Sequence, residues 1–343
     1  MSSTLTIGIP VYNENSHLRK TVENLTKITS QVKVRIELII VDNFSVDGTR
    51  EYLKSLDISY SNLELTTVFN EKNEGFNYSA DLIMQKARND YLWIIGGHDA
   101  INLEGLKTIL ELIESKPTYL IGNATIRDES LNTIINKSLW GDIKSQDFTN
   151  LDEFFSALGG PCQAISCNII KTAGLKQISN TKRFTKYWVF IERIIDLLLA
   201  NENELLIMFI DKPIVEMLIE SEGWQSTGNL GPSKEKEYGS FFTSLDLMEL
   251  INHKFIDRHK VIRAYPIWRD FFAIPRTFVI AKSKGLPINL ELLLRVIKVY
   301  KRSKLFWIAG IPILLCPSFV AKKLLRLKYL VHISRRVFGI KTF

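Results

Sequence analysis

The first 130 residues alternate between two hydrophobic patterns, and this alternation restricts the fold more than any other feature of the sequence. Short apolar or β-branched runs bounded by turn residues predict strands at Leu5–Pro10, Ile36–Asp42, Leu63–Asn70 and Tyr91–Gly96. The stretches between them have helical spacing and predict helices at Ser16–Thr29, Asp47–Ser55, Tyr78–Ala87 and Leu103–Ile113. This repeat predicts an α/β fold with a mostly parallel sheet flanked by helices.

The alternation becomes less regular in the second half of the chain. We expect further strands at Tyr119–Ile126, Gln163–Asn168 and Leu205–Ile210, and a helix at Tyr187–Ala200. The segment Gly223–Gly239 is rich in Gly, Ser and charged residues and predicts a mobile loop. We therefore expect a catalytic domain at 1–222, a mobile loop at 223–239 and a basic, amphipathic helical region at 240–343.

The charge of the chain is distributed unevenly. Of the 44 basic residues, 20 lie in residues 253–343, together with 3 of the 37 acidic residues. From Leu292 to the last residue there are 12 basic residues and no acidic one. A block of one charge sign on an apolar background indicates an anionic partner, either nucleic acid or an anionic membrane. The segment is too apolar for a solvated phosphate-binding arm, so we expect no nucleic-acid partner.

Cysteine usage and the first residues bear on the cellular compartment. Cys162, Cys167 and Cys316 are odd in number and form no CxxC pair, which favours free thiols in a reducing compartment over a single disulfide. The chain begins without a basic leader, an apolar stretch and a small-residue cleavage site. We therefore expect the catalytic part to lie in the cytoplasm.

Polar residues follow the first two predicted strands, at the edge of the sheet where ligands bind in parallel folds. The first strand ends in Pro10, where a dinucleotide-binding protein needs a glycine-rich GxGxxG turn, so a dehydrogenase is disfavoured. The second strand ends at Asp42, whose carboxylate can accept hydrogen bonds from a base or a ribose. Asp47 either contacts the ligand in the same way or caps the next helix.

The third and fourth strands end in further candidates. Gly75 allows a ligand to approach the backbone closely, and Asn73 is either a ligand contact or a simple turn former. The fourth strand leads into Gly97, His98 and Asp99. Carboxylate and imidazole both bind divalent metals, so this pair is either a metal site or an exposed turn.

These motifs, in this order, resemble those of the family 2 glycosyltransferases with the GT-A fold, in particular bacterial surface-polysaccharide (O-antigen or capsule) sugar transferases. The likeness spans about residues 4–215 and rests on PVYNEN, VDNFSVDGT, NEG with an Asp after five more residues, and an acidic motif at a strand end. It implies inverting transfer from a nucleotide-sugar, usually UDP- or dTDP-linked, with Mg²⁺ or Mn²⁺. It also implies a nucleotide-sugar half at 1–125 and an acceptor half at 126–222. The implied donor-binding residues are Pro10, Tyr12, Glu14, Asp42, Ser45, Asp47, Asn73, Gly75, Asp81 and Gly97.

The resemblance also points to the metal ligands, where the sequence departs from the family. The family has two or three acids in a row at the end of the fourth strand, and here only Asp99 matches, with His98 in the middle position and Gly97 in the first. The metal ligands implied are therefore Asp99 and His98. The site either binds metal more weakly, uses His98, or works without metal.

Inverting transfer also needs a general base for the acceptor hydroxyl. The segment 188–196 resembles the family's helix that carries this acid. Glu192 is our first candidate and Asp196, one turn later, the second. The alternative for Glu192 is an ordinary helix acid paired with a neighbour.

The C-terminal region predicts contact with a membrane. Leu290–Tyr300 has apolar residues at helical spacing, and the apolar stretch Leu305–Val320 is flanked by lysines and interrupted by two prolines. A spanning helix needs about 20 apolar residues, so this stretch is better suited to lie in the interface or dip into it. The alternatives are a packed helical subdomain or a dimer interface. Basic amphipathic helices bind anionic lipid.

The leading hypothesis is an inverting glycosyltransferase that builds a surface glycan on a lipid-linked acceptor, as a peripheral protein on the cytoplasmic face of the inner membrane. The first alternative is a catalytically degenerate binding or scaffold protein at the membrane, suggested by the acid that Gly97 replaces. A nucleotidyltransferase is disfavoured, because the N-terminal region has no basic, glycine-rich phosphate loop.

Overall fold

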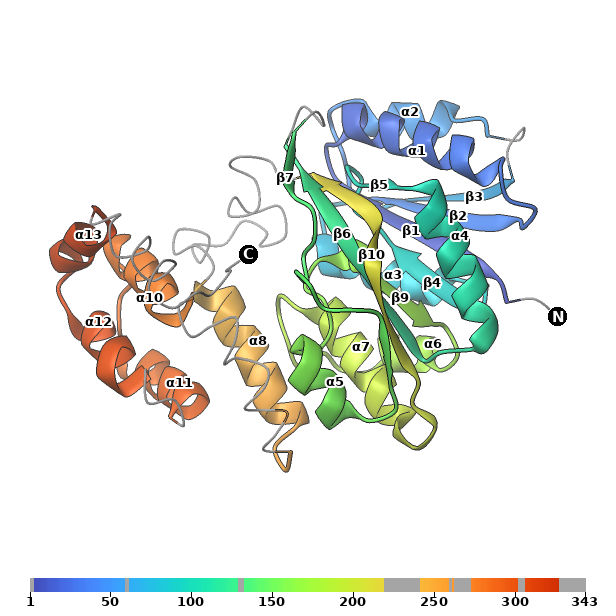
Figure 1. The fold of residues 1–343 in the computed structure, drawn as a ribbon. Coiled ribbons are helices and arrows are strands. Elements are labelled where there is room, and N and C mark those ends of the chain that lie inside the picture. The colour runs from blue at the N-terminus through green and yellow to red at the C-terminus, as the bar shows by residue number, and fades with distance from the viewer. Residues whose placement is uncertain are drawn as a thin grey trace. The chain divides into compact units, whose positions relative to one another are not determined.

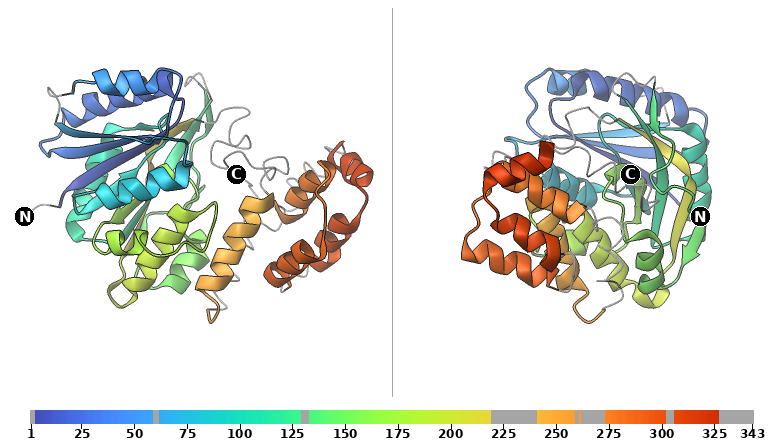
Figure 2. Two further views of the ribbon diagram at one scale, coloured as in Figure 1. Left: turned by 180° about the vertical axis from the view of Figure 1, so that it is seen from behind. Right: turned by 60° about the vertical axis from the view of Figure 1, so that its left-hand side comes forward.

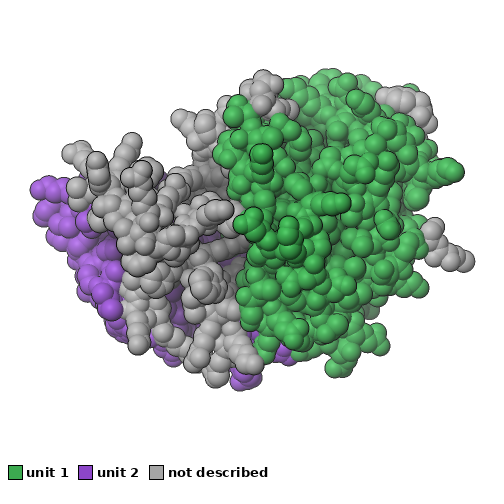
Figure 3. Space-filling view, in the orientation of Figure 1, with its two compact units in different colours: residues 1–184, 189–224 green, residues 185–188, 225–343 purple. Residues whose placement is uncertain are grey.

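The computed structural model describes residues 3–58, 62–128, 133–218, 241–258, 261, 273–301 and 306–326. By its own contacts the chain divides into two units, coloured separately in Figure 3. Unit 1 comprises 1–184 and 189–224, and unit 2 comprises 185–188 and 225–343. The expected mobile loop at 223–239 lies outside the described residues. The expected nucleotide-sugar and acceptor halves of the catalytic domain stay a prediction.

The first half of unit 1 is a parallel sheet with helices between its strands, as the sequence predicts. The strands are β1 (Leu5–Val11), β2 (Ile36–Asp42), β3 (Leu63–Phe69) and β4 (Tyr91–Ile94). They pair in parallel in the order β3-β2-β1-β4, with Val11 opposite Asp42. The chain moves from β1 outward to β3 and then returns to the other side of β1. The order therefore reverses between β1 and β4, and such a reversal is where open α/β sheets bind ligands.

The second half of unit 1 makes the sheet mixed. Its strands are β5 (Ala100–Ile101), β6 (Tyr119–Arg127), β7 (Ile134–Asn136), β8 (Gln146–Phe148), β9 (Asn168–Lys171) and β10 (Ile207–Leu218). The strand order continues β4-β9-β6-β10-β5, with β7 on β6 and β8 on β10. β9 is antiparallel to both neighbours, whereas β6 and β10 are parallel.

The strand predicted at Gln163–Asn168 is wrong in position. The 3-10 helix η2 (Ile165–Cys167) occupies half of that range, and β9 begins only at Asn168. The side-chain amide of Asn168 donates to the carbonyls of Cys162, Ala164 and Ile165. These bonds hold a tight turn in a run whose apolar residues by themselves suggest a strand.

Helices cover both faces of this sheet (Figures 1 and 2). Those of unit 1 are α1 (Asn15–Thr29), α2 (Thr49–Ser55), α3 (Phe76–Lys86), α4 (Leu103–Leu112), α5 (Leu151–Leu158), α6 (Leu175–Ser179) and α7 (Val189–Ala200), with short 3-10 turns η1 (Ile113–Ser115) and η3 (Glu202–Glu204). α3 packs on β1 and β2, and α6 and α7 pack on α3. A Cβ at Gly8 of β1 would lie 2.4 Å from Ile83 Cγ2 of α3, so glycine is what lets this helix approach the sheet so closely.

The secondary structure of unit 2 in its described residues is helical, apart from turns and the short segment 185–188. It contains α8 (Phe241–Lys254), α10 (Ala273–Ser283), α11 (Leu290–Tyr300), the π-helical turn η5 (Phe306–Gly310), α12 (Ile311–Leu315) and α13 (Ser318–Arg326). The helix predicted at Leu290–Tyr300 is confirmed as α11. Phe278 of α10 contacts the rings of Phe241, Tyr300 and Phe306, with centroids 5.5, 5.8 and 6.3 Å away. This aromatic cluster joins four helical elements into one core.

One buried carboxylate fixes the short segment 185–188 within unit 2. Asp246 of α8 accepts the Thr185 hydroxyl and the backbone N–H groups of Lys186 and Tyr187. Burial raises the pKa of Asp246, and these hydrogen bonds oppose that shift. Asp246 therefore holds the residues that lead directly into α7.

Candidate active site

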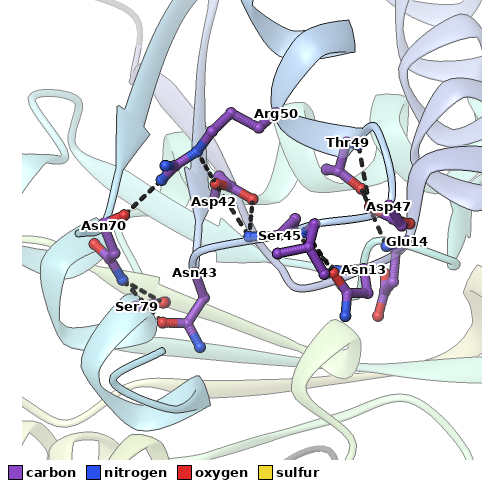
Figure 4. Close-up of polar contacts among 11 residues, drawn as sticks. Asn13, Glu14, Asp42, Asn43, Ser45, Asp47, Thr49, Arg50, Asn70 and Ser79 are labelled. Carbon is purple, nitrogen blue, oxygen red and sulfur yellow. Dashed lines mark hydrogen bonds and ion pairs between the residues drawn. The ribbon is translucent and has the colours of Figure 1, made fainter. Parts of the chain in front are cut away.

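The loops that follow β1 and β2 are joined by hydrogen bonds at the carboxyl edge of the sheet (Figure 4). The backbone N–H of Asn13 donates to Ser45 Oγ at 2.9 Å, and the N–H of Val46 donates back to Asn13 Oδ1 at 2.8 Å. Asp47 Oδ2 accepts the N–H of Asn15 at 3.0 Å, and its Oδ1 accepts the N–H and the hydroxyl of Thr49 at 3.1 and 2.6 Å. The two loops therefore form one rigid polar edge.

The Asp47 carboxylate accepts hydrogen bonds from the first residues of two helices. Asn15 begins α1 and Thr49 begins α2, and both N–H groups lack a partner within their own helix. Burial alone raises the pKa of Asp47, but the hydrogen bonds from Asn15 and Thr49 outweigh it and lower the pKa below its ordinary value. The N-cap residue of α2 is Gly48, and Asp47, one residue earlier, accepts the first N–H of that helix from outside the cap position. A donor contact of Asp47 stays a prediction.

Asp42, at the tip of β2, is completely buried and forms an ion pair. Arg50 Nε donates to Asp42 Oδ2 at 2.8 Å, and the Ser45 N–H donates to Oδ1 at 3.2 Å. Arg50 Nη2 also donates to the carbonyl of Asn70, at the end of β3. The guanidinium lies 5.4 Å from the ring centroids of both Phe44 and Phe69. Asp42 and Arg50 therefore anchor the ends of β2 and β3 to each other.

A chain of asparagines continues the network to α3. Asn43 Nδ2 donates to Asn73 Oδ1 at 2.8 Å, and Asn43 Oδ1 accepts Asn70 Nδ2 at 3.0 Å and the Glu74 N–H at 2.9 Å. Asn73 Oδ1 also accepts the N–H of Gly75 at 3.0 Å. Gly75 has φ +84° as it precedes the first turn of α3, a conformation that glycine adopts without strain.

The end of β4 places a histidine between two carboxylates. His98 Nδ1 lies 3.5 Å from Glu14 Oε1, and His98 Nε2 lies 3.9 Å from Asp99 Oδ1. A Cβ at Gly97 would lie 2.2 Å from Glu14 Oε2, so any side chain there would displace the Glu14 carboxylate. Asp99 is buried, and it accepts the Ser166 hydroxyl at Oδ2 and the Leu218 N–H at Oδ1. Burial raises the pKa of Asp99, and the nearby His98 opposes that rise.

The donor set at this edge does not by itself fit a divalent metal. The two nitrogens of His98 face different carboxylates, so one ion cannot bind the imidazole and both acids together. Among the described residues, no group of three or more His, Cys, Asp or Glu side chains is arranged to hold a metal ion. We therefore assign no reaction step to a metal, and Mg²⁺ or Mn²⁺ at Asp99 and His98 stays a prediction.

Three of the predicted site residues lie in a second cluster, built around α7. Arg193 is fully buried, and its Nε lies 3.4 Å from Asp81 Oδ1, while Arg183 Nη2 lies 2.6 Å from Asp81 Oδ2. Arg193 also donates to the Thr181 hydroxyl at 2.9 Å and lies 4.0 Å from Asp196 Oδ2. Glu192, 1% exposed, accepts the N–H of Phe184 at 2.9 Å. The carboxylate of Asp81 thus faces the arginines and not the sheet edge.

The structure brings most of the predicted donor residues together at the strand ends. Tyr12, Glu14, Ser45, Asp47, Asn73, Gly75, Gly97, His98 and Asp99 lie in the four strand-end loops, and Pro10 and Asp42 lie in the strands that lead into them. Sequence reasoning missed Asn13, Asn43, Asn70 and Arg50, although Asn43 and Asn70 directly follow strands and Asn13 is the second residue after one. Ser166 had no sequence signal, because only the pairing of β4 with β9 brings it near Asp99.

The chain belongs to glycosyl transferase family 2, whose sequence profile matches residues 6–178, half of the chain. Glycosyltransferase GlyG of Streptococcus pneumoniae serotype 4 is 26% identical over 132 residues. These residues are 38% of this chain and 42% of GlyG, so the chain spans about two fifths of that relative's length.

Two proteins of solved structure illustrate the similarity in fold. Residues 1–349 of TarS from S. aureus superpose with a TM-score of 0.58 at 15% identity, covering 86% of this chain and 78% of that chain. TarS has also been solved with UDP-GlcNAc. The mannosyltransferase PcManGT from Pyrobaculum calidifontis, in complex with GDP-Man and Mn²⁺, gives a TM-score of 0.50 at 13% identity, covering 92% and 88%. At these identities the likeness establishes the fold, a GT-A-like mixed sheet flanked by helices.

Proposed function

We propose that this chain is an inverting glycosyltransferase that transfers a sugar from a nucleotide-sugar donor to a hydroxyl of a lipid-linked or surface glycan. The observation that carries the proposal is the family match across the same residues that build the polar edge at β1, β2, β3 and β4. Two proteins of similar fold have been solved in complex with nucleotide-sugars, UDP-GlcNAc in one and GDP-Man in the other. We favour a UDP- or dTDP-linked donor.

The chemistry is a single displacement at the anomeric carbon. The acceptor hydroxyl forms the new bond while the bond from that carbon to the diphosphate oxygen breaks, and its electron pair leaves with the nucleoside diphosphate. A carboxylate takes the hydroxyl proton. We assign this role first to Glu192 and second to Asp196. Hydrogen-bond donors at the strand ends stabilise the charge on the departing diphosphate.

Donor hydrolysis by the purified full-length chain tests the enzyme class. UDP-, dTDP-, GDP- and CMP-sugars are incubated with Mn²⁺, with Mg²⁺ or with EDTA, and the released nucleotide is measured. We expect release of one nucleoside diphosphate, UDP or dTDP, and a loss of release in Asp99→Asn. The matched control is Asp147→Asn, which changes an exposed acid of β8.

Each outcome of this screen assigns one feature. Release that needs metal and Asp99 places Mg²⁺ or Mn²⁺ in the site, whereas release that survives EDTA removes metal from the mechanism. If no nucleotide is released and none shifts the unfolding temperature, the scaffold hypothesis would replace the enzyme hypothesis. The burial of Asp99 beneath Ser166 is the observation that favours that second candidate.

We also propose that unit 2 docks on the anionic cytoplasmic face of the inner membrane, where a lipid-linked acceptor is available. Between Phe306 and Ala321 no residue is charged, and Ile308 and Phe319 are 76% and 63% exposed. The exposed lysines Lys322 and Lys323 follow directly. No single described helix is long and apolar enough to cross a bilayer, although Phe306–Leu315 and Ser318–Leu325 meet the length and composition criteria as a pair bent by 118°. This arrangement suits insertion into the interface.

Vesicle flotation tests this docking. Wild-type protein is expected to float with phosphatidylglycerol-containing vesicles. With vesicles of pure phosphatidylcholine it is expected to stay in the bottom fraction of the gradient. The double variant Ile308→Glu, Phe319→Glu is expected to lose flotation, because two charges then face the acyl chains. Ile256→Glu, at another exposed apolar residue of unit 2, is the control and is expected to float. Flotation of the double variant would refute the proposal that Ile308 and Phe319 insert into the membrane. Dimerisation of wild-type protein that the double variant abolishes would make it a self-association surface.

A further inference from the structure

Phe44 has a backbone conformation that a phenylalanine rarely adopts. Its φ is +69°, in the left-handed region, where a bulky L-residue is strained. Two other positions of the same edge have a positive φ and are glycine, Gly48 at +91° in the same loop and Gly75 at +84° in the loop after β3. Asn13, at +55°, is of a residue type that tolerates the region. Phe44 alone in these loops combines a large side chain with this strain.

Packing of the Phe44 ring does not account for the strain. The side chain remains 41% exposed, so the ring is not part of the core. The guanidinium of Arg50 lies over the Phe44 ring, 5.4 Å from its centroid. Arg50 is itself fixed by Asp42 and by the carbonyl of Asn70. The ring is therefore held against a fixed partner while a large part of it faces solvent.

Phe44 lies at the polar edge of the sheet, where we propose that the donor binds. Phe44 is the second residue after β2, and the N–H of Asn43 before it donates to Val11 O at the end of β1 at 2.9 Å. Tyr12, the residue after β1, is also 40% exposed. Two exposed aromatic side chains thus follow two adjacent parallel strands.

We propose that Phe44 is a stacking platform for the nucleobase of the nucleotide donor, an inference that rests on the proposed function. Every nucleobase has a π-face, and stacking on an aromatic side chain strengthens binding by roughly 5- to 150-fold. The strained backbone and Arg50 fix the ring before the ligand arrives, so little freedom is lost on binding. Strain retained at an exposed ring is typical of a site that pre-organises for its ligand.

Four substitutions at Phe44 distinguish the contribution of the aromatic ring from that of the strained backbone. Phe44→Gly and Phe44→Ala both remove the ring, but only glycine relaxes the positive φ. Phe44→Leu keeps an apolar side chain over Arg50 without an aromatic face, and Phe44→Tyr keeps the face. Ile135→Ala, at an apolar residue of β7 that is 56% exposed in the wild type and lies outside the proposed site, is the matched control. The dissociation constants of UDP, dTDP and GDP are measured by calorimetry, and the unfolding midpoints by thermal denaturation.

We expect the Gly, Ala and Leu variants to bind the nucleotide about 10-fold more weakly, with Phe44→Tyr and Ile135→Ala close to wild type. The glycine variant is expected to unfold at a higher temperature than the alanine variant although the two bind equally weakly. Full affinity in Phe44→Leu or Phe44→Ala, beside a wild type that binds, would overturn the platform and leave the proposed function intact. A wild type that binds none of the three nucleotides would overturn both.

Discussion

Glu192→Gln is expected to lower kcat by about 10²–10⁴-fold, the range that loss of a positioned general base produces. Glutamine has the same shape and keeps one oxygen to accept the Phe184 N–H, which Glu192 accepts at 2.9 Å. The hydrogen bond at the start of α7 therefore survives while the ability to take a proton is lost. We expect kcat to fall with little change in the KM for donor or in the unfolding midpoint.

Two further variants determine how this result is read. Glu204→Gln, at an exposed acid beyond the end of α7, is the control and is expected to keep wild-type kcat. Asp196→Asn is expected to have a smaller effect than Glu192→Gln. The reverse order would transfer the base role to Asp196, and full activity in both variants would remove the base from α7.

Arg193→Met is expected to lower the free energy of unfolding by about 3–5 kcal/mol, the usual effect of removing one partner of a buried ion pair. The Arg193 side chain is fully buried, and Asp81 beside it is 3% exposed. Methionine fills a similar volume, so cavity formation contributes little. The change leaves the Asp81 carboxylate with Arg183 alone and removes the donors to Thr181 and Ser179.

Urea denaturation followed by circular dichroism measures this effect. Arg127→Met is the matched control, because Arg127 makes a two-bond pair with Glu216 at 2.8 Å but is partly exposed. Its unfolding midpoint is expected to stay near that of the wild type, since exposed pairs contribute little. The double variant Asp81→Asn, Arg193→Met is expected to recover part of the lost stability, because the buried carboxylate that has lost one of its two arginines is then neutral. A single Arg193→Met variant as stable as the control would show that the buried pair contributes nothing.

The two predictions concern adjacent residues of α7, but one change is expected to affect activity and the other the stability of the fold. Glu192→Gln leaves the fold intact and removes a proton acceptor, whereas Arg193→Met acts on the fold. A variant of Arg193 that loses activity in proportion to its folded fraction would identify Arg193 as purely structural.

Local sequence patterns were enough to predict the parallel half of the sheet and the polar edge at its strand ends. The runs Leu5–Pro10 and Ile36–Asp42 differ from β1 and β2 by no more than one residue, because a buried parallel strand is a continuous apolar run. Strand ends are local features too. Glu14, Asp42 and Asn73 are therefore found simply by reading the polar residues after each apolar run. The positions of these residues along the chain sufficed to predict that they share one edge.

The pairing of the later strands and the burial of the acids could not be predicted from local sequence. The antiparallel insertion of β9 between β4 and β6 depends on contacts between residues that are far apart in sequence, which no local periodicity encodes. That insertion brings Ser166 to Asp99 and turns an apparently exposed acid into a buried one. In the same way, α7 packing on α3 pairs Arg193 with Asp81, 112 residues apart. Local hydrophobic patterns thus specify which elements form and where they end, whereas the charge state and partners of each acid follow from long-range packing.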